Sequence, residues 1–139
     1  MRERKVLHFK AAERTFEPYT GFENAYASGA ASIARMLTPD VSPRLGAGIA
    51  RYRNVRTTWH LPFDEVVLVI QGKFTVRSRG VEYAAVAGDV LHFPRGCPVE
   101  YDITEEVTLF YAEHPATVTG QDTQGGATVS TRREGFAAS

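Results

Sequence analysis

Between residues 31 and 115 the sequence is a succession of short β-forming runs separated by turns, and this pattern limits the possible folds more than any other feature. The turns are marked by Gly72, Gly80, Gly88 and Gly96, each beside polar residues. The runs cover residues 32–37, 46–53, 66–70, 74–77, 81–86, 90–93, 99–103 and 107–111. Short strands with a turn signal about every 8 to 12 residues are typical of an antiparallel sandwich or barrel. We therefore predict an all-β fold.

Two segments of this pattern differ from the short alternating strands, one in its continuous apolar character and one in its alanine content. The unbroken apolar run at residues 66–70 predicts a strand that is buried on both faces. The alanine-rich segment 24–36 is compatible with a helix, but Gly29 and Ser32 weaken a helix and favour a strand in its second half.

Three regions follow from this pattern and from the composition of the ends. Residues 1–30 are expected to form an N-terminal arm and residues 31–115 a single barrel. Residues 116–139 are rich in glycine, threonine, serine and glutamine, a composition typical of a flexible C-terminal tail.

Charge and composition exclude several classes of partner. The 16 basic residues of the 139-residue chain balance its 16 acidic residues, so no overall field favours nucleic acid or an anionic membrane. No apolar run approaches the roughly 20 residues that span a bilayer. The single cysteine, Cys97, leaves no internal disulfide to form. We expect a cytoplasmic protein with neither a nucleic-acid nor a membrane partner.

Two glycine-containing motifs carry a resemblance to a known superfamily. In the first, His60 is followed after four residues by Glu65 and after six more by Gly72; in the second, Gly88 precedes Pro94-Arg95-Gly96. Their spacing resembles that of the paired motifs of cupins. The resemblance implies a double-stranded β-helix, also called a jelly-roll barrel.

Within the cupins, the sequence most resembles the ethanolamine utilization protein EutQ and its relatives. The similar segments are Trp59-His60-Leu61-Pro62-Phe63-Asp64-Glu65-Val66, Gly88-Asp89-Val90-Leu91-His92-Phe93-Pro94-Arg95-Gly96 and Tyr111-Ala112-Glu113-His114-Pro115. The resemblance implies a link to the catabolism of small amines or alcohols. The acetate kinase activity attributed to that family is not carried over, because the chain has no glycine-rich phosphate loop.

Cupins usually hold a divalent metal through three histidines and a carboxylate, and this chain keeps only part of that set. By motif position, His60 and Glu65 are retained, whereas Thr58 and Val99 stand at histidine positions. His92 would be the third ligand of an iron, zinc, nickel or manganese ion if its side chain faced the lumen. The alternative is that Leu91 and Phe93 form the core face and His92 points to the opposite side.

Without a metal, the same residues suggest an acid–base site with an aromatic wall. A carboxylate at Glu65 would raise the pKa of His60 and make the two a catalytic pair. Tyr52, Tyr101 and Tyr111 are candidate ligand-binding residues. The competing explanation for each of them is packing in the core or at an interface.

Arg56 is a further candidate ligand-binding residue, because an arginine at the mouth of the barrel would select an anionic substrate. A charge that protects an edge strand from pairing is the competing explanation for this residue.

Three functions remain open at this point. The first is a EutQ-like cupin that binds a small metabolite in its lumen. The second is a metal-dependent lyase, isomerase or dioxygenase that uses His60 and Glu65, and the third is a binding module without catalysis. For each of them we expect a homodimer that pairs through the strand at residues 32–37.

Overall fold

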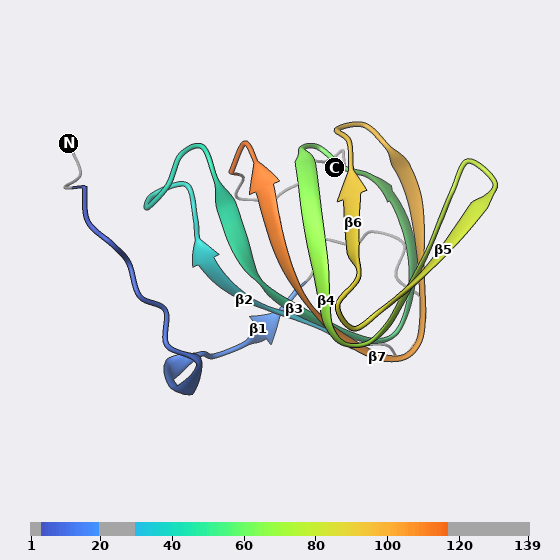
Figure 1. Ribbon diagram of the computed structural model, residues 1–139, viewed down its shortest axis with the longest axis horizontal. Coiled ribbons are helices and arrows are strands. Elements are labelled where there is room, and N and C mark those ends of the chain that lie inside the picture. The colour runs from blue at the N-terminus through green and yellow to red at the C-terminus, as the bar shows by residue number, and fades with distance from the viewer. Residues whose placement is uncertain (1–3, 20–29, 117–139) are drawn as a thin grey trace.

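The computed structural model describes residues 4–19 and 30–116, and this part of the chain is almost entirely β-structure (Figure 1). The strands are β1 (Glu17–Pro18), β2 (Ala30–Leu37), β3 (Gly46–His60), β4 (Asp64–Ser78), β5 (Val81–Val86), β6 (Val90–Phe93) and β7 (Pro98–His114), and a 3-10 helix, η1, spans Ala11–Glu13. No helix in the described ranges has the length and apolar character needed to cross a membrane. The prediction of an all-β fold is confirmed.

The strands form one antiparallel sheet that curls into a barrel, in the order β1-β2-β3-β7-β4-β5, with β6 paired to β4. Three long strands, β3, β4 and β7, run through both halves of the barrel (Figure 1). The second half of β7 pairs with the first halves of β3 and β4, and the first half of β7 pairs with their second halves. This is the arrangement of a double-stranded β-helix.

Each long strand changes course where its pairing shifts register. In β4 the irregularity surrounds Gly72, whose φ is +90°. A Cβ atom on Gly72 would lie 2.1 Å from the carbonyl oxygen of Glu106 on β7, so only glycine allows this close approach. The sequence pattern suggested a turn at this glycine, but the structure has a bend inside one continuous strand. In β3 the shift lies at Asn54, which also has a positive φ.

The interior is apolar and aromatic because alternate residues of every strand face inward. Tyr101 of β7 lies at its centre and meets Phe74 edge-on, with ring centroids 4.9 Å apart. The core also contains Val55, Leu61, Phe63, Val67, Val69, Val76, Phe93, Val99, Ile103, Val107 and Leu109. This packing holds the three long strands around a single lumen.

The segment 66–70 is not buried on both faces, and that prediction is wrong. Val67 and Val69 are 2% and 1% exposed, whereas Val66 and Ile70 are 44% and 47% exposed. The strand therefore alternates like any half-exposed strand, although its outer residues are apolar. Hydropathy alone cannot reveal the alternation when both faces carry apolar side chains.

The strand interpretation of the segment 24–36 is confirmed from Ala30 onward by β2, and its first part lies outside the described residues. Residues 4–16 lead away from the barrel, while Glu17–Pro18 pairs with β2 (Figure 1). The predicted tail lies outside the described residues beyond residue 116.

Candidate functional site

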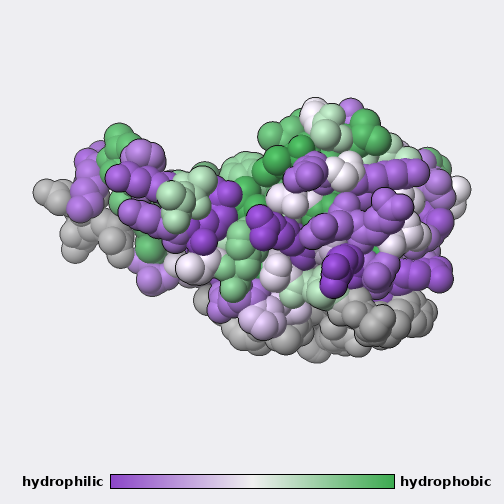
Figure 2. All heavy atoms as spheres, turned by 90° about the horizontal axis from the view of Figure 1, so that it is seen from below, coloured by the Kyte–Doolittle hydropathy of each residue, from purple (hydrophilic) through white to green (hydrophobic). Residues whose placement is uncertain are grey.

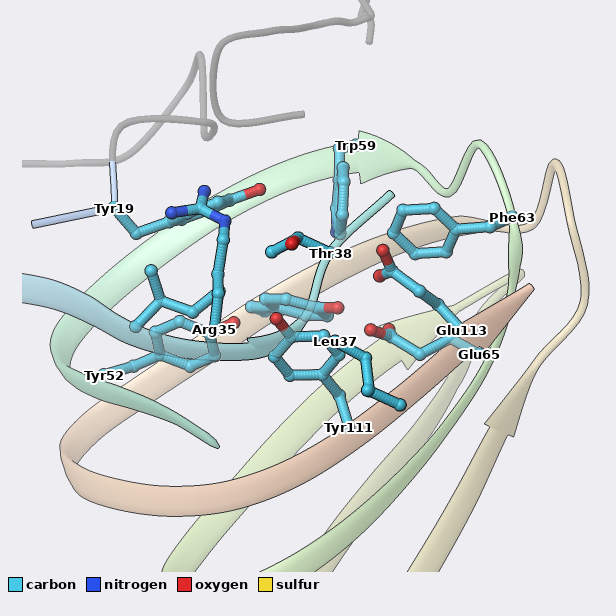
Figure 3. Close-up of a pocket in the computed structure, with 12 residues that line it drawn as sticks. Tyr19, Arg35, Leu37, Thr38, Tyr52, Trp59, Phe63, Glu65, Tyr111 and Glu113 are labelled. Carbon is cyan, nitrogen blue, oxygen red and sulfur yellow. The ribbon is translucent and has the colours of Figure 1, made fainter. Parts of the chain in front are cut away.

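The lumen contains a pocket formed mainly by β2, β3, β4 and β7, and it is rich in tyrosine and carboxylate side chains (Figure 3). Its free space is ≈ 40 Å³, enough for about three groups the size of water. It is lined by Tyr19, Ile33, Arg35, Leu37, Thr38, Tyr52, Trp59, Phe63, Glu65, Tyr101, Tyr111 and Glu113.

Two buried glutamates form the most unusual feature of this pocket. Glu65 of β4 and Glu113 of β7 are register partners on neighbouring strands, and they are 8% and 9% exposed. Their side chains project side by side into the pocket (Figure 3). Burial raises the pKa of Glu65 well above its usual value of 4.5, and the charge of Glu113 raises it further. The pair therefore resists carrying two negative charges without a counter-charge.

Two glycines of β3 make room for the side chains of β7 that face them. Gly46 pairs with Glu113, and a Cβ atom there would lie 2.9 Å from both Cγ and Oε2 of that glutamate. Gly48 pairs with Tyr111, and a Cβ there would lie 2.7 Å from the tyrosine hydroxyl. Any larger residue at these positions would displace Glu113 or Tyr111, so the glycines are part of the site.

The three tyrosines singled out from the sequence all lie against this pocket. Burial raises the pKa of Tyr52, Tyr101 and Tyr111, so their hydroxyl groups stay protonated and can donate hydrogen bonds. The charge of Glu113 also raises the pKa of Tyr111, while a hydrogen bond with Trp59 acts to lower that of Tyr101. The pocket thus offers neutral hydroxyl donors beside acidic acceptors.

Of the described residues that line the pocket, Arg35 carries a positive charge. Its Nη1 atom lies 2.6 Å from Oε2 of Glu17, and its guanidinium lies over the Tyr19 ring, 6.0 Å from the centroid. Glu17 lies in β1 and Arg35 in β2, so this ion pair joins the N-terminal segment to the wall of the pocket. It also holds the guanidinium on the tyrosine side of the pocket, away from the two glutamates (Figure 3).

The structure does not bring His60 to Glu65, contrary to the acid–base pair expected from the sequence. His60 is exposed at the end of β3, whereas its neighbour Trp59 lines the pocket and Thr57 is fully buried. Strand side chains alternate between two faces, so an error of one residue in the register transfers a side chain from lumen to surface. The inward side chains on this part of β3 are therefore those of Thr57 and Trp59, each one residue before a position that the motif spacing assigned to a ligand.

The expected set of metal ligands is also not assembled. His92 is exposed on β6, while Leu91 and Phe93 take the inner face, as the alternative interpretation held. Across the described residues, no cluster of three or more histidine, cysteine, aspartate or glutamate side chains could hold a metal ion. Glu65 and Glu113 offer two carboxylates where such sites normally have three protein ligands. These residues do not fit the divalent metal expected from the motif.

Arg56 lies outside the pocket. It is exposed on β3, where its Nη2 atom is 3.4 Å from Glu100 and its Nε atom 3.6 Å from Asp102. Arg77 joins the same group with its Nη1 atom 2.9 Å from Asp102. Arg56 thus belongs to a group of ion pairs on the outer surface. Its position agrees with a charge on the sheet surface and not with a residue that binds a ligand in the pocket.

The sequence interpretation missed Glu113 and Arg35. Glu113 follows Val107, Leu109 and Tyr111 at intervals of two, so the period of a strand already placed its side chain on the inner face. Nothing in the sequence distinguished Arg35 from the other arginines, because its position depends on the pairing of β2 with β3.

A sequence model of the family described as "Ethanolamine utilisation protein EutQ" matches residues 8–120. The chain belongs to the EutQ family. Of the curated EutQ-family proteins, "Acetate kinase EutQ" of Escherichia coli K12 is 32% identical over 84 residues, which is 60% of this chain and 36% of that protein. The Clostridioides difficile protein of the same name is 27% identical over 81 residues, 58% of this chain and 52% of that protein. The chain thus corresponds to about a third to a half of these EutQ proteins.

Solved structures agree on the cupin fold of the EutQ family. The Clostridium difficile EutQ protein is 26% identical with a TM-score of 0.61, covering 64% of this chain and 71% of that one. The ethanolamine utilization protein from Salmonella typhimurium is 24% identical with a TM-score of 0.62, and the match covers 76% of this chain and 98% of that one. An RmlC-like cupin from Shewanella frigidimarina is 17% identical with a TM-score of 0.62, and the match covers 85% of this chain and 97% of that one. The double-stranded β-helix expected from the motifs is confirmed.

Proposed function

We propose that this EutQ-family cupin binds a small protonated amine, of the size of an amino alcohol, in the pocket at Glu65 and Glu113. The observation that carries the proposal is the pair of buried carboxylates on adjacent strands. The sequence resemblance led to the same general expectation, a small metabolite of amine or alcohol catabolism bound in the lumen.

Electrostatics favours a cationic ligand. Buried carboxylates are costly without a counter-charge, and burial and mutual repulsion raise the pKa of Glu65. An ammonium group has three N–H donors and one positive charge, so it can bridge both carboxylates. Its binding would relieve the repulsion between Glu65 and Glu113.

Size and lining favour a short ligand with a hydroxyl group. The ≈ 40 Å³ of free space, enough for about three groups the size of water, suits a short ligand. Tyr52 and Tyr111 carry protonated hydroxyls that can bond a ligand oxygen, and the ring faces of Trp59 and the tyrosines attract a cation. Ethanolamine, the compound in the family's description, has this size and both groups.

Acetate, the substrate in the name of the curated relatives, fits this pocket less well. Its charge has the same sign as that of the glutamates, and Arg35 is already paired with Glu17. A pocket of this composition should therefore select the ammonium ion over the carboxylate. Metal-assisted chemistry through His60 receives no support from the donor set.

Calorimetric titration tests the proposal. We expect saturable binding of ethanolamine, no binding of ethylene glycol, which has the same length without the charge, and no binding of acetate. At a ligand concentration about a hundredfold above Kd, the free energy of unfolding should rise by about 2.7 kcal/mol.

Variants of the two glutamates identify the site. Glu65→Gln and Glu113→Gln should each weaken ethanolamine binding by roughly tenfold or more, because each removes half of the carboxylate pair. Glu105→Gln is the matched control, since Glu105 is exposed at the bend of β7 and should leave the affinity unchanged. Absence of ethanolamine binding by the wild type, or acetate binding that survives both substitutions, contradicts the proposal.

A further inference from the structure

Two apolar surfaces are not covered by any other residue within the described ranges 4–19 and 30–116. One is the N-terminal arm, residues 4–10, and the other is a groove beside β6. In Figure 1 the arm leads away from the barrel on the β2 side, whereas β5 and β6, which contribute to the groove, lie on the other side.

The arm exposes apolar side chains while contacting little of its own barrel. Val6 is 92% exposed, Leu7 40% and Phe9 44%. Residues 4–13 are all exposed, and Figure 2 shows this end of the chain projecting from the body of the molecule with apolar residues among polar ones. Large apolar side chains on a projecting segment usually become buried against a partner.

The groove has a volume of ≈ 540 Å³ and an apolar lining. It lies between β6 and the β4–β5 hairpin and is lined by Val76, Ser78, Arg79, Val81, Tyr83, Val90, Leu91, His92, Phe93, Pro94 and Cys97. Val81, Tyr83 and Val90 are 49%, 46% and 60% exposed, so several apolar side chains could still be buried there. Volumes of this size accommodate ligands as large as a drug molecule, and hence a few side chains.

The backbone of β6 is also available on this side. Among the described strands, β6 pairs only with β4, so no described strand uses the backbone N–H and C=O groups of its other edge. An extended peptide can add to such an edge and place alternate side chains on its two faces. Leu91 and Phe93 define the inner face of β6, whereas Val90 and His92 point outward.

Apolar side chains in the arm are spaced two residues apart, as a strand added to the edge of β6 requires. Leu7 and Phe9 are two residues apart and would share the inner face of an added strand with Leu91, while Val6 would lie outside beside Val90. The segment is not part of any helix or strand in the monomer, so it can pair without breaking existing structure.

We propose that residues 4–9 of one copy add as a strand to the edge of β6 in a second copy, with Leu7 and Phe9 in its groove. The arm leads away from the barrel on the β2 side, and β5 and β6 lie on the other side, which makes a second copy the natural donor (Figure 1). Two reciprocal exchanges of this kind close a two-fold dimer. This interface differs from the pairing of residues 32–37 expected from the sequence.

Sedimentation equilibrium of the full chain tests the exchange. We expect a dimer, and the double variant Leu7→Asp/Phe9→Asp should raise the dimer dissociation constant by roughly tenfold or more. Ala12→Asp is the matched control, because it introduces the same charge into the exposed arm outside the added strand and should leave the constant within about twofold.

Cross-linking between copies determines where the arm lies. In a Cys97→Ser background, chains carrying Phe9→Cys are mixed with chains carrying Tyr83→Cys and then oxidised. We expect a covalent dimer that contains one chain of each kind, and none when Glu105→Cys replaces Tyr83→Cys. A monomeric wild type, equal cross-linking to Glu105→Cys, or a disulfide within one chain of the Phe9→Cys/Tyr83→Cys variant overturns the proposal.

Discussion

At the scale of single residues, the two glycines of β3 determine what the lumen can hold. Gly48 faces rigid neighbours, because a Cβ there would lie 2.6 Å from the backbone oxygen of Ala34. Gly46 faces the flexible side chain of Glu113 instead. The same substitution should therefore have different effects at the two positions.

We expect Gly48→Ala to destabilise the fold by about 1–3 kcal/mol, because neither the Ala34 carbonyl nor the packed Tyr111 ring can move without repacking. Gly46→Ala should change stability by less than about 1 kcal/mol but weaken ethanolamine binding, because it displaces only the Glu113 carboxylate. Urea unfolding and calorimetric titration of both variants measure the two effects. Equal losses of stability would contradict this distinction.

The raised pKa of Glu65 makes stability depend on pH. In the unfolded chain this carboxyl ionises near its usual value of 4.5, whereas the folded protein holds the proton to higher pH. Its contribution to stability is therefore fully present below that value and is lost as the pH rises through the folded pKa. Urea unfolding from about pH 4 to about pH 8 should show a decline that Glu65→Gln reduces. A variant whose decline matches that of the wild type would disprove this role.

The histidines show which residue properties the sequence could provide. The aromatic character of Tyr101 and Tyr111 led to the expectation that they line the pocket, and period-two alternation placed His92 outside in one of two interpretations. It failed for His60, because the motif spacing fixed the register and the true inward residues are Thr57 and Trp59. A shift of one residue is enough to reverse the face of a strand.

At the scale of elements, the bend of β4 depends on Gly72. Its positive φ is compatible with other residues at a moderate cost, but the Cβ of any of them would overlap the Glu106 carbonyl at 2.1 Å. The sequence identified this glycine as a break between strands because glycine signals turns and bends alike. Only the pairing of β4 with β7 on both sides of it shows that the strand continues.

Gly88 allows the cost of a positive φ to be measured separately from the cost of steric overlap with β7. Gly88 also has a positive φ, of +95°, but nothing lies within 4 Å of the Cβ position. We expect Gly88→Ala to cost about 1–2 kcal/mol from backbone strain alone, and Gly72→Ala to cost clearly more because the overlap with β7 is added. Thermal unfolding of both variants measures the difference. Equal midpoints would show that β7 moves away without penalty.

At the scale of the whole molecule, association and stability should be linked. If the arms are exchanged, a folded chain is stabilised by its partner, so Tm should rise with protein concentration. Leu7→Asp/Phe9→Asp should remove this dependence, and Ala12→Asp should retain it. Calorimetric scans across about a hundredfold range of concentration test the link. A concentration-independent Tm in the wild type would exclude a stabilising exchange.

The three long strands that pass through both halves of the barrel also govern how the protein can open. Because β3, β4 and β7 each contribute hydrogen bonds on either side of their bends, neither half can separate while the other stays intact. Backbone amides near Val55 and those near Leu109 should then exchange with deuterium through the same global opening and with the same free energy. The barrel would behave as a single cooperative unit, and motion that admits a ligand to the lumen must come from its rim.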